Sequence, residues 1–438
     1  MEKIYLDYNA TTPLDSTVYE KILESLKIHW ANPSSTYNSG EIANKAIENA
    51  RKQIGDMINC ESQEIIFTSG GTESNFMVIN SIAEQFNKPT IITSNIEHPS
   101  IENPLKKLEK DGRINVIFAP VCKYGFVEPQ TIKDLLTPEV KLVTIMLANN
   151  ETGIIQPISE IAQVLEDYQK EHNLKDKILF HTDAAQAIGK IPVDVKKLRV
   201  DYLTIVGHKF YGPRIGAIFF NKNYPLKPIF LGGGQERNYR SGTENTAMIV
   251  GLGQAALIVK ENVFGFYNHL LEVRDYFEKL LLESDFKINI NGKNDFSERI
   301  PNTCNFSFIG KESTGLNILF QCPQVETGLG AACHVQTREI SSVSQVLLNS
   351  HIPEEIARNA MRVSMGRSTT KSEVKKVADL FFEAVKQLEL LLEEDSEPES
   401  VPFPKEEKEE KEEKERKKEK KKKKEKRRSK KGIKANKE

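Results

Sequence analysis

Cysteine is scarce and unpaired in this chain of 438 residues. The five cysteines are Cys60, Cys122, Cys304, Cys322 and Cys333, with no C-x-x-C pair among them. This spacing argues against a disulfide framework and a zinc ribbon, and it is typical of a protein in a reducing cytosolic setting. We therefore expect no metal site and treat each thiol as a candidate nucleophile.

Long apolar segments are also lacking. The chain has no run of about 18 uncharged apolar residues, so we expect no membrane-spanning segment and no membrane partner. The first residues, MEKIYLDYNATTP, reach strand-like sequence almost at once. We therefore expect no signal or transit peptide and predict a cytoplasmic protein.

The formal net charge of −1 hides two regions of opposite charge. Residues 405–438 carry 19 Lys and Arg and 10 Glu, a net charge of +9, which leaves −10 for residues 1–404. Such a dense charge run buries too little apolar surface to offset its ordering entropy. We predict a charged low-complexity tail over 396–438, either disordered or a solvated helix. Its basic run at 421–431 is open to three interpretations: an import signal giving a nuclear fraction, a nucleic-acid contact, or a solubilising extension without a partner.

The body alternates short β-branched runs with amphipathic stretches. The predicted strands lie at 64–67, 90–94, 115–120, 141–147, 178–183, 202–206 and 216–220. This alternation predicts an α/β fold with a mostly parallel sheet covered by helices, in a large domain over 1–264. From about residue 265 long helices and isolated strands predict a smaller α+β domain over 265–395, which the first 15 or so residues are open to joining.

Polar residues follow most of the predicted strands, where open α/β sheets bind their ligands. Gly71 and Thr72 open a helical run after the first strand, and amides at a helix start favour a phosphate group. The G-K-[ST] element of a P-loop is missing. A plain capped turn explains this segment equally well.

Further along the sheet, the strand ends carry His98, Asn150, Asp183, Gln186 and Lys209. An Asp that ends an apolar strand needs a donor or a cation as a partner. A desolvated lysine amine is nucleophilic and can bind an aldehyde. A lysine, an acid, amide donors and an anion cradle on one sheet edge are what pyridoxal phosphate requires.

Motifs that occur in order along residues 4–390 carry a family resemblance. They are DYNATTP (7–13), NPSS (32–35), TSGGTESN (68–75), EHPS (97–100), NNETG (149–153), DAAQ (183–186), GHKFYGP (207–213) and RSGTEN (240–245). This set resembles the class V aminotransferases, in the branch of cysteine desulfurases and selenocysteine lyases. The resemblance implies a pyridoxal-phosphate enzyme of fold type I with a seven-stranded sheet, and a homodimer with active sites at the subunit interface.

The resemblance also implies roles for individual residues. Lys209 would hold the cofactor aldehyde and move protons, and Asp183 would keep the pyridine nitrogen protonated. Asn150 and Gln186 would donate to the phenolic oxygen, with Asn150 also facing the substrate. His98 would stack on the ring and take part in proton transfer.

Phosphate and substrate contacts are implied in the same way. Gly71, Thr72 and His208 would hold the phosphate, together with Thr243 from the other subunit. Arg362 would bind the substrate carboxylate, for which a planar bidentate cation is suited. Without the resemblance, Arg362 would be interpreted as a surface ion-pair residue.

Cys333 is the second expected centre of chemistry. The polar, Gly- and Ser-containing segment 324–345 predicts a mobile loop whose cysteine is exposed, unlike Cys60 and Cys304 in apolar-patterned segments. In desulfurases the loop cysteine attacks the substrate sulfur and carries a persulfide. In selenocysteine lyases the corresponding cysteine is tied to the selectivity for selenium.

Three functions remain open from the sequence. The first is cleavage of L-selenocysteine, with a reductant, to L-alanine and selenide; GAACH (330–334), RVSMGRSTT (362–370), Tyr37 and Val206 resemble the lyases more than the desulfurases. The second is a cysteine desulfurase that passes sulfur from a Cys333 persulfide to an acceptor for iron–sulfur clusters or tRNA thiolation. The third is a binding or scaffold protein without turnover.

Overall fold

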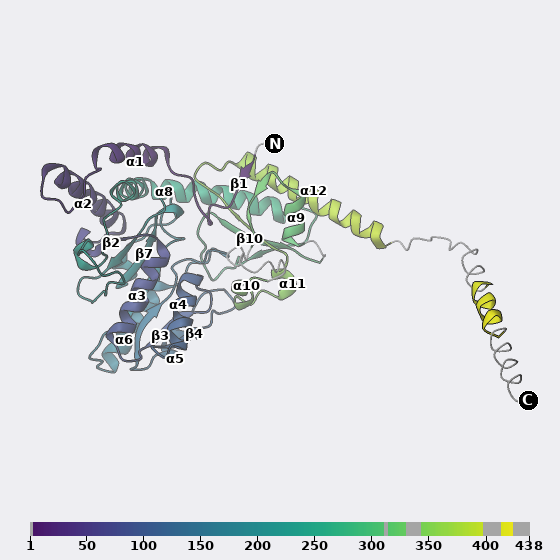
Figure 1. The fold of residues 1–438 in the computed structure, drawn as a ribbon, viewed down its shortest axis with the longest axis horizontal. Helices are drawn as coiled ribbons and strands as arrows, with labels where there is room; N and C mark the ends of the chain where they lie inside the picture. Colours follow the sequence, from purple (N-terminus) through teal and green to yellow (C-terminus); the bar gives the residue numbers. More distant parts are fainter. Residues whose placement is uncertain (1–2, 311–313, 330–342, 397–412, 424–438) are drawn as a thin grey trace, which may run out of the picture. The chain divides into compact units, whose positions relative to one another are not determined.

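The computed structural model describes residues 3–310, 314–329, 343–396 and 413–423 (Figure 1). Contacts along the chain define two units, Met1–Leu388 and Glu389–Glu438. Within the second unit, residues 413–423 form a fully exposed helix, as the solvated-helix interpretation of the tail predicts there. All further description concerns the first unit.

A seven-stranded sheet dominates this unit, in the order β2-β8-β7-β6-β5-β3-β4. Its strands are β2 (Ile65–Thr68), β3 (Thr90–Ser94), β4 (Asn115–Ala119), β5 (Val140–Thr144), β6 (Leu179–Asp183), β7 (Tyr202–Val206) and β8 (Gly216–Phe220). Only β8 runs antiparallel to its two neighbours. The predicted mostly parallel α/β sheet is confirmed.

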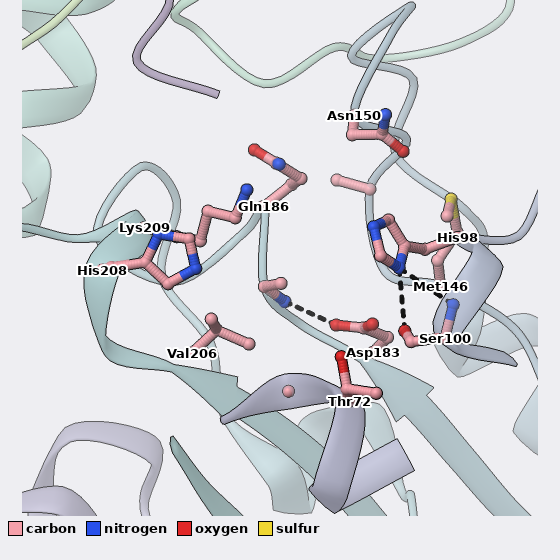
Figure 2. A pocket seen from close by; sticks show the side chains of 13 residues that line it. Thr72, His98, Ser100, Met146, Asn150, Asp183, Gln186, Val206, His208 and Lys209 are labelled. Carbon is pink, nitrogen blue, oxygen red and sulfur yellow. Dashed lines mark hydrogen bonds between the residues drawn. The ribbon is translucent and has the colours of Figure 1, made fainter. Parts of the chain in front are cut away.

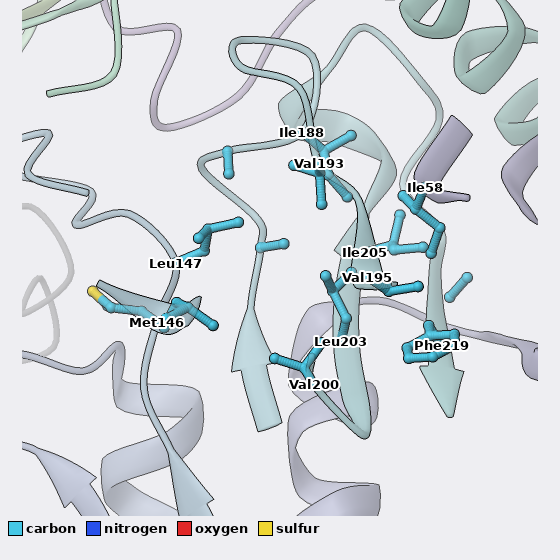
Figure 3. Close-up of a cluster of buried hydrophobic side chains, with 14 of the residues drawn as sticks. Ile58, Met146, Leu147, Ile188, Val193, Val195, Val200, Leu203, Ile205 and Phe219 are labelled. Carbon is cyan, nitrogen blue, oxygen red and sulfur yellow. The ribbon is translucent and has the colours of Figure 1, made fainter. Parts of the chain in front are cut away.

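Helices cover both faces of this sheet (Figure 1). The helices up to α7 are α1 (Ser16–Ile28), α2 (Asn38–Ile58), α3 (Gly71–Gln85), α4 (Pro99–Lys110), α5 (Pro129–Leu135), α6 (Ile158–Glu171) and α7 (Val195–Leu198). Short 3-10 turns lie at Ser62–Glu64, Gly207–Lys209 and Glu236–Asn238. Neighbouring strand residues point to opposite faces: Leu203 and Phe219 pack in the cluster drawn in Figure 3, while Tyr202 and Ile218 pack under α3 and α4.

A second core surrounds a four-stranded antiparallel sheet of order β12-β13-β10-β9. The strands are β9 (Ile288–Asn291), β10 (Thr303–Phe308), β12 (Gly328–Leu329) and β13 (Ala360–Ser364), and β1 (Ile4–Tyr5) pairs separately with β11 (Val325–Glu326). The helices here are α9 (Gly315–Gln321), α10 (Gln345–Asn349), α11 (Glu354–Ala357) and α12 (Lys371–Ser396). The start of the predicted 324–345 loop is thus two short strands, which is a correction. Their partners β1 and β13 are distant in sequence and gave no local signal.

Helix α8 (Thr246–Leu282) joins the two cores. Its first half contributes Leu252 and Ala256 to the core of the large sheet, and its second half contributes Val273 and Phe277 to the second core. Among the described residues it is the one helix long and apolar enough to span a membrane, although its apolar stretch contains no run of 18 uncharged residues. Half of its apolar window is buried inside the molecule, as in the core helix of a folded domain. The domain boundaries at 264 and 395 stay predictions, and the first falls inside α8.

Candidate active site

A cavity of about 230 Å³ opens at the carboxyl ends of the parallel strands (Figure 2). Eight of the residues singled out in the sequence line it: Gly71, Thr72, His98, Asn150, Asp183, Gln186, His208 and Lys209. Ser100, Met146, Ala148, Ala185 and Val206 complete the lining. Segments more than a hundred residues apart in the sequence thus meet at one edge of the sheet.

The amino end of α3 forms one wall of this cavity. Among the described residues, no side chain caps the helix at Gly70, so the first amides of α3 lack a side-chain acceptor. A Cβ at Gly71 would lie 2.6 Å from Cγ2 of Val206, too close for any other residue. Close approach of the backbone to β7 thus requires glycine here, and it leaves backbone N–H groups and Thr72 beside the cavity for an anion.

Lys209 lies in the 3-10 turn that follows β7. Its Nζ donates to the carbonyl oxygens of Asn9, at 2.7 Å, and Ala10, at 2.8 Å. Both acceptors belong to the DYNATTP motif near the amino end, so this segment holds the amine at the cavity (Figure 2).

Asp183 ends β6 and is only 8% exposed. Its Oδ2 accepts from Nδ2 of Asn75 at 2.8 Å, and its Oδ1 accepts from the backbone N–H of Ala185 at 2.9 Å. The second of these bonds is drawn in Figure 2. The donor partners that the sequence argument required for a buried Asp are therefore present, and Asn75 is one it did not identify.

His98 caps α4, and its ring orientation is fixed by Ser100. The backbone N–H of Ser100 donates to Nδ1 at 3.1 Å, and the Ser100 hydroxyl lies 2.8 Å from the same nitrogen (Figure 2). Burial lowers the pKa of His98, opposed by the charge of Asp183 and aided by that of Lys209. The neutral imidazole therefore carries its proton on Nε2.

His208 and Gln186 are also held by residues of the amino-terminal segment. Nδ1 of His208 lies 3.1 Å from Oγ1 of Thr11, and Nε2 of Gln186 donates to the carbonyl oxygen of Asn9 at 3.0 Å. Burial, followed by the charges of Lys209 and Arg214, lowers the pKa of His208 to about 4. His208 is thus neutral at pH 7, a hydrogen-bonding rather than a charged neighbour for an anion.

Arg362, the predicted carboxylate ligand, lies on β13 next to the cavity without lining it. Its Nη2 donates to Oδ1 of Asp7 at 2.7 Å, and its Nη1 donates to the carbonyl oxygen of Asn150 at 3.0 Å. The side chain is 5% exposed, so the alternative of a surface ion pair is wrong. Its Nε is buried and finds no partner among the described residues.

Thr243 lies apart from the Lys209 cavity. It lines a different cleft with Arg214, Glu236 and Arg240. In this chain it is therefore not brought together with Gly71 and Thr72, and a phosphate role for it requires a second subunit.

Cys333 lies outside the described residues. The described residues before and after it are next to the site: Gly328 of β12 pairs with Arg362, and the Ser344 hydroxyl donates to Oε2 of Glu151 at 2.5 Å. Of the other thiols, Cys304 is fully buried, and burial raises the pKa values of Cys304 and Cys60. Neither favours the reactive thiolate, in agreement with the prediction.

Besides Asn75, two residues that support the site, Asn9 and Lys190, were not identified from the sequence. Asn9 accepts from Lys209 and Gln186 through its carbonyl oxygen, and Lys190 donates to the side chains of Asn9 and Gln186. Asn9 stands within a quoted motif, and Lys190 follows Gln186 by four residues. The i, i+4 spacing was the one local signal, and it does not by itself predict burial.

The fold and the cavity together define a class of protein. The family model of Aminotransferase class-V matches residues 4–377, and the chain belongs to this family. It is 46% identical over 415 residues to the selenocysteine lyase of Rattus norvegicus, covering 88% of this chain and 95% of the relative. It is 39% identical over 389 residues to the cysteine desulfurase IscS of Dictyoglomus turgidum, covering 88% and 95%. A solved structure titled NifS-like protein superposes with a TM-score of 0.78 at 31% identity, covering 89% of this chain and all of that chain.

Proposed function

We propose that this chain is a pyridoxal-phosphate-dependent selenocysteine lyase, which converts L-selenocysteine and a reductant to L-alanine and selenide. The observation that carries the proposal is the 46% identity to selenocysteine lyase across nearly the whole chain. The gathering of eight predicted cofactor residues in one cavity supports it. The lower identity to cysteine desulfurase, 39%, makes that activity the second candidate.

The residues present fit pyridoxal phosphate. Gly71 leaves the amino end of α3 open for the phosphate, and Thr72 and His208 lie at the same cavity. Asp183 presents a carboxylate for the pyridine nitrogen, Gln186 and Asn150 present amides for the phenolic oxygen, and Lys209 lines the same cavity with an amine for the aldehyde. When bound, this cofactor withdraws electrons from the α-carbon of an amino acid substrate.

The chain's own groups then supply binding and proton transfer. Asp183 is held in place by two donors, Nδ2 of Asn75 and the backbone N–H of Ala185, so its carboxyl group is oriented to accept a hydrogen bond from a protonated ring nitrogen. His98 is neutral at pH 7 with its proton on Nε2, so this atom donates a hydrogen bond into the cavity; Nε2 can take up a proton only after the ring's own proton has moved to Nδ1. Lys209 must leave the carbonyl oxygens of Asn9 and Ala10 to act as an amine at the cavity.

Substrate recognition falls to Arg362 and Asn150 in this proposal. The unpartnered Nε of Arg362 and its fork geometry suit a carboxylate, which would compete with Asp7 for the guanidinium. Conversion of selenocysteine to alanine replaces selenium on the β-carbon with hydrogen. That change is a two-electron reduction, so two thiols, which leave as a disulfide, or another two-electron reductant must be consumed.

The first experiment is a side-by-side assay of purified protein on L-selenocysteine and L-cysteine with excess reductant, measuring alanine. We expect turnover of selenocysteine, whereas cysteine should bind with almost no turnover. Lys209→Ala is the inactive control. Comparable release of sulfide from cysteine would favour the desulfurase. Absence of both activities, in a protein without visible cofactor absorbance, would favour the scaffold interpretation.

A homodimer and a cytosolic location belong to the same proposal. Thr243 lies outside the Lys209 cavity, and the surface exposes large apolar side chains, among them the single tryptophan Trp30, 73% exposed, and Leu231, 87% exposed. Such side chains are typical of a subunit interface. A protein acceptor for the selenide and a nuclear role for the tail remain further proposals.

A further inference from the structure

A second lysine, which is buried, lies behind the cavity. Lys190 is 5% exposed, and its Nζ donates to Oε1 of Gln186 at 2.6 Å and to Oδ1 of Asn9 at 3.0 Å. It does not line the cavity, so the proposed reaction leaves it without a role. Burial removes the solvation of a lysine amine, and this loss destabilises the fold unless hydrogen-bond partners offset it. We therefore expect Lys190 to have a role in the site beyond packing.

We propose that Lys190 is a positioning residue that fixes which end of the Gln186 amide faces the cofactor. This inference rests on the proposed function and deepens it. Because the amine of Lys190 donates to Oε1, the NH2 group of Gln186 must point the other way. That NH2 donates to the carbonyl oxygen of Asn9 at 3.0 Å and leaves its second hydrogen for the cavity.

The same lysine orients Asn9. Oδ1 of Asn9 accepts from Lys190 and from Nδ2 of Asn302, each at 3.0 Å. Nδ2 of Asn9 therefore donates to the carbonyl oxygen of Asn150, at 3.2 Å, and to Oγ1 of Thr303, at 2.8 Å. The carbonyl oxygen of Asn9 is thereby held where Lys209 and Gln186 both donate to it. Lys190 thus supports the two groups that meet the cofactor from this side.

The electrostatic environment agrees with this geometry. Burial, followed by the charges of Lys209 and Arg362, lowers the pKa of Lys190 well below its ordinary value. A neutral amine still donates two hydrogen bonds, so the orientation of Gln186 does not depend on the charge of Lys190. A purely structural ion pair would instead need a carboxylate, and the partners found are two amides.

The test compares Lys190→Met, Gln186→Leu and their combination in the full chain, with the exposed Lys196→Met as the matched control. The readouts are the visible absorption maximum of the loaded protein and the dissociation constant of pyridoxal phosphate for the stripped protein. Lys190→Met is expected to shift the maximum in the same direction as Gln186→Leu and to weaken binding about tenfold, the loss of one good hydrogen bond. Lys190→Arg, which keeps the donors, is expected to recover part of both effects.

The double variant decides how Lys190 acts. If it acts through Gln186, Lys190→Met weakens binding several-fold less in the Gln186→Leu background than in wild type, and the loss that stays is the part carried by Asn9. An unshifted spectrum, or equal losses in both backgrounds, overturns the inference. If Lys190→Met does not fold, Lys190→Gln is measured instead. The glutamine amide can donate or accept, so it no longer fixes the orientation of the Gln186 amide, and the same shift of the absorption maximum is expected. A wild-type protein without cofactor absorbance would instead overturn the proposed function, and this inference with it.

Discussion

Burial and neighbouring groups decide which titratable side chains of this protein are protonated. Ser100 fixes the proton of His98 on Nε2, and burial keeps that imidazole neutral. Glu151 shows the same principle for a carboxyl group: burial raises its pKa to about 7, against the opposing effects of the Ser344 hydroxyl and the charge of Arg362. Its neighbour Asn150 lines the cavity, so this titration takes place next to the site.

Glu151 makes the stability of the protein depend on pH. Since its pKa is higher in the folded chain than the ordinary value of 4.5, the folded state holds the proton more tightly, and stability falls as the pH rises from 4.5 to about 7. Glu151→Gln cannot ionise, so it should gain stability relative to wild type across that window, by on the order of 3 kcal/mol. Chemical denaturation of both proteins at about pH 5 and about pH 8 measures the difference. An equal difference at both pH values would contradict the prediction.

Cys333 is predicted to act on the substrate and not on the cofactor. Cys333→Ser should keep the visible absorbance of the bound cofactor and lower alanine formation on the order of a hundredfold or more, as loss of a group in the chemical step does. Cys122→Ser, at a partly exposed thiol outside the cavity, is the control and should match wild type. Full activity of Cys333→Ser on both substrates would show that the assignment of this cysteine is wrong.

Among the elements, the amino end of α3 depends most on one residue type. Gly71→Ala would place a Cβ 2.6 Å from Cγ2 of Val206 and push the helix start away from β7. We expect cofactor affinity to fall about tenfold, as for an overpacked core site. Gly70→Ala is the matched control, because a Cβ there meets nothing within 4 Å.

A second substitution separates crowding from other causes. In Val206→Ala the methyl group that meets the new Cβ is gone, so Gly71→Ala should lose less affinity in that background than in wild type. Pyridoxal phosphate titrations of the four stripped proteins give the comparison. Equal losses in both backgrounds would mean that contact with Val206 is not the cause.

The elements were predictable from the sequence where local pattern decides them. Strands at 90–94, 202–206 and 216–220 lie where β-branched and aromatic runs predicted them, and the Thr370–Glu373 capping box forms reciprocally at the start of α12. The strand predicted at 141–147 ends at Thr144, because the N–H of Met146 donates to the buried Glu97 carboxyl instead.

Long-range pairs were beyond prediction. The partner of Arg362 is Asp7, and the partners of Lys209 are carbonyl oxygens near the amino end. No local pattern encodes contacts between residues so far apart. The motifs identified which residues matter, and tertiary structure alone shows what supports them.

For the whole molecule, the main prediction concerns sharing of a site between subunits. If Thr243 completes the site of a partner, coexpressed Lys209→Ala and Thr243→Ala chains should form mixed dimers with one intact site. Random pairing gives roughly a quarter of wild-type activity per chain. Alanine formation by the copurified pair, compared with each variant alone, measures this. Activity no greater than the mean of the two variants would contradict sharing.

The tail is predicted to act apart from catalysis. Deletion of residues 405–438 should leave kcat and KM unchanged, because the described part of the tail is fully exposed and belongs to a separate unit. If the basic run is an import signal, deletion should lower the nuclear fraction of a fluorescent fusion, and so should replacement of its Lys and Arg by Gln. An unchanged distribution would contradict that role.

Helix α8 limits how the two hydrophobic cores can move relative to each other. Its 37 residues extend about 55 Å as one continuous rod, with one half packed in each hydrophobic core. A hinge rotation of one core against the other would bend this rod and stretch its backbone hydrogen bonds. We therefore expect substrate entry and product exit to occur without a hinge rotation between the two cores, through small sliding shifts of packed elements.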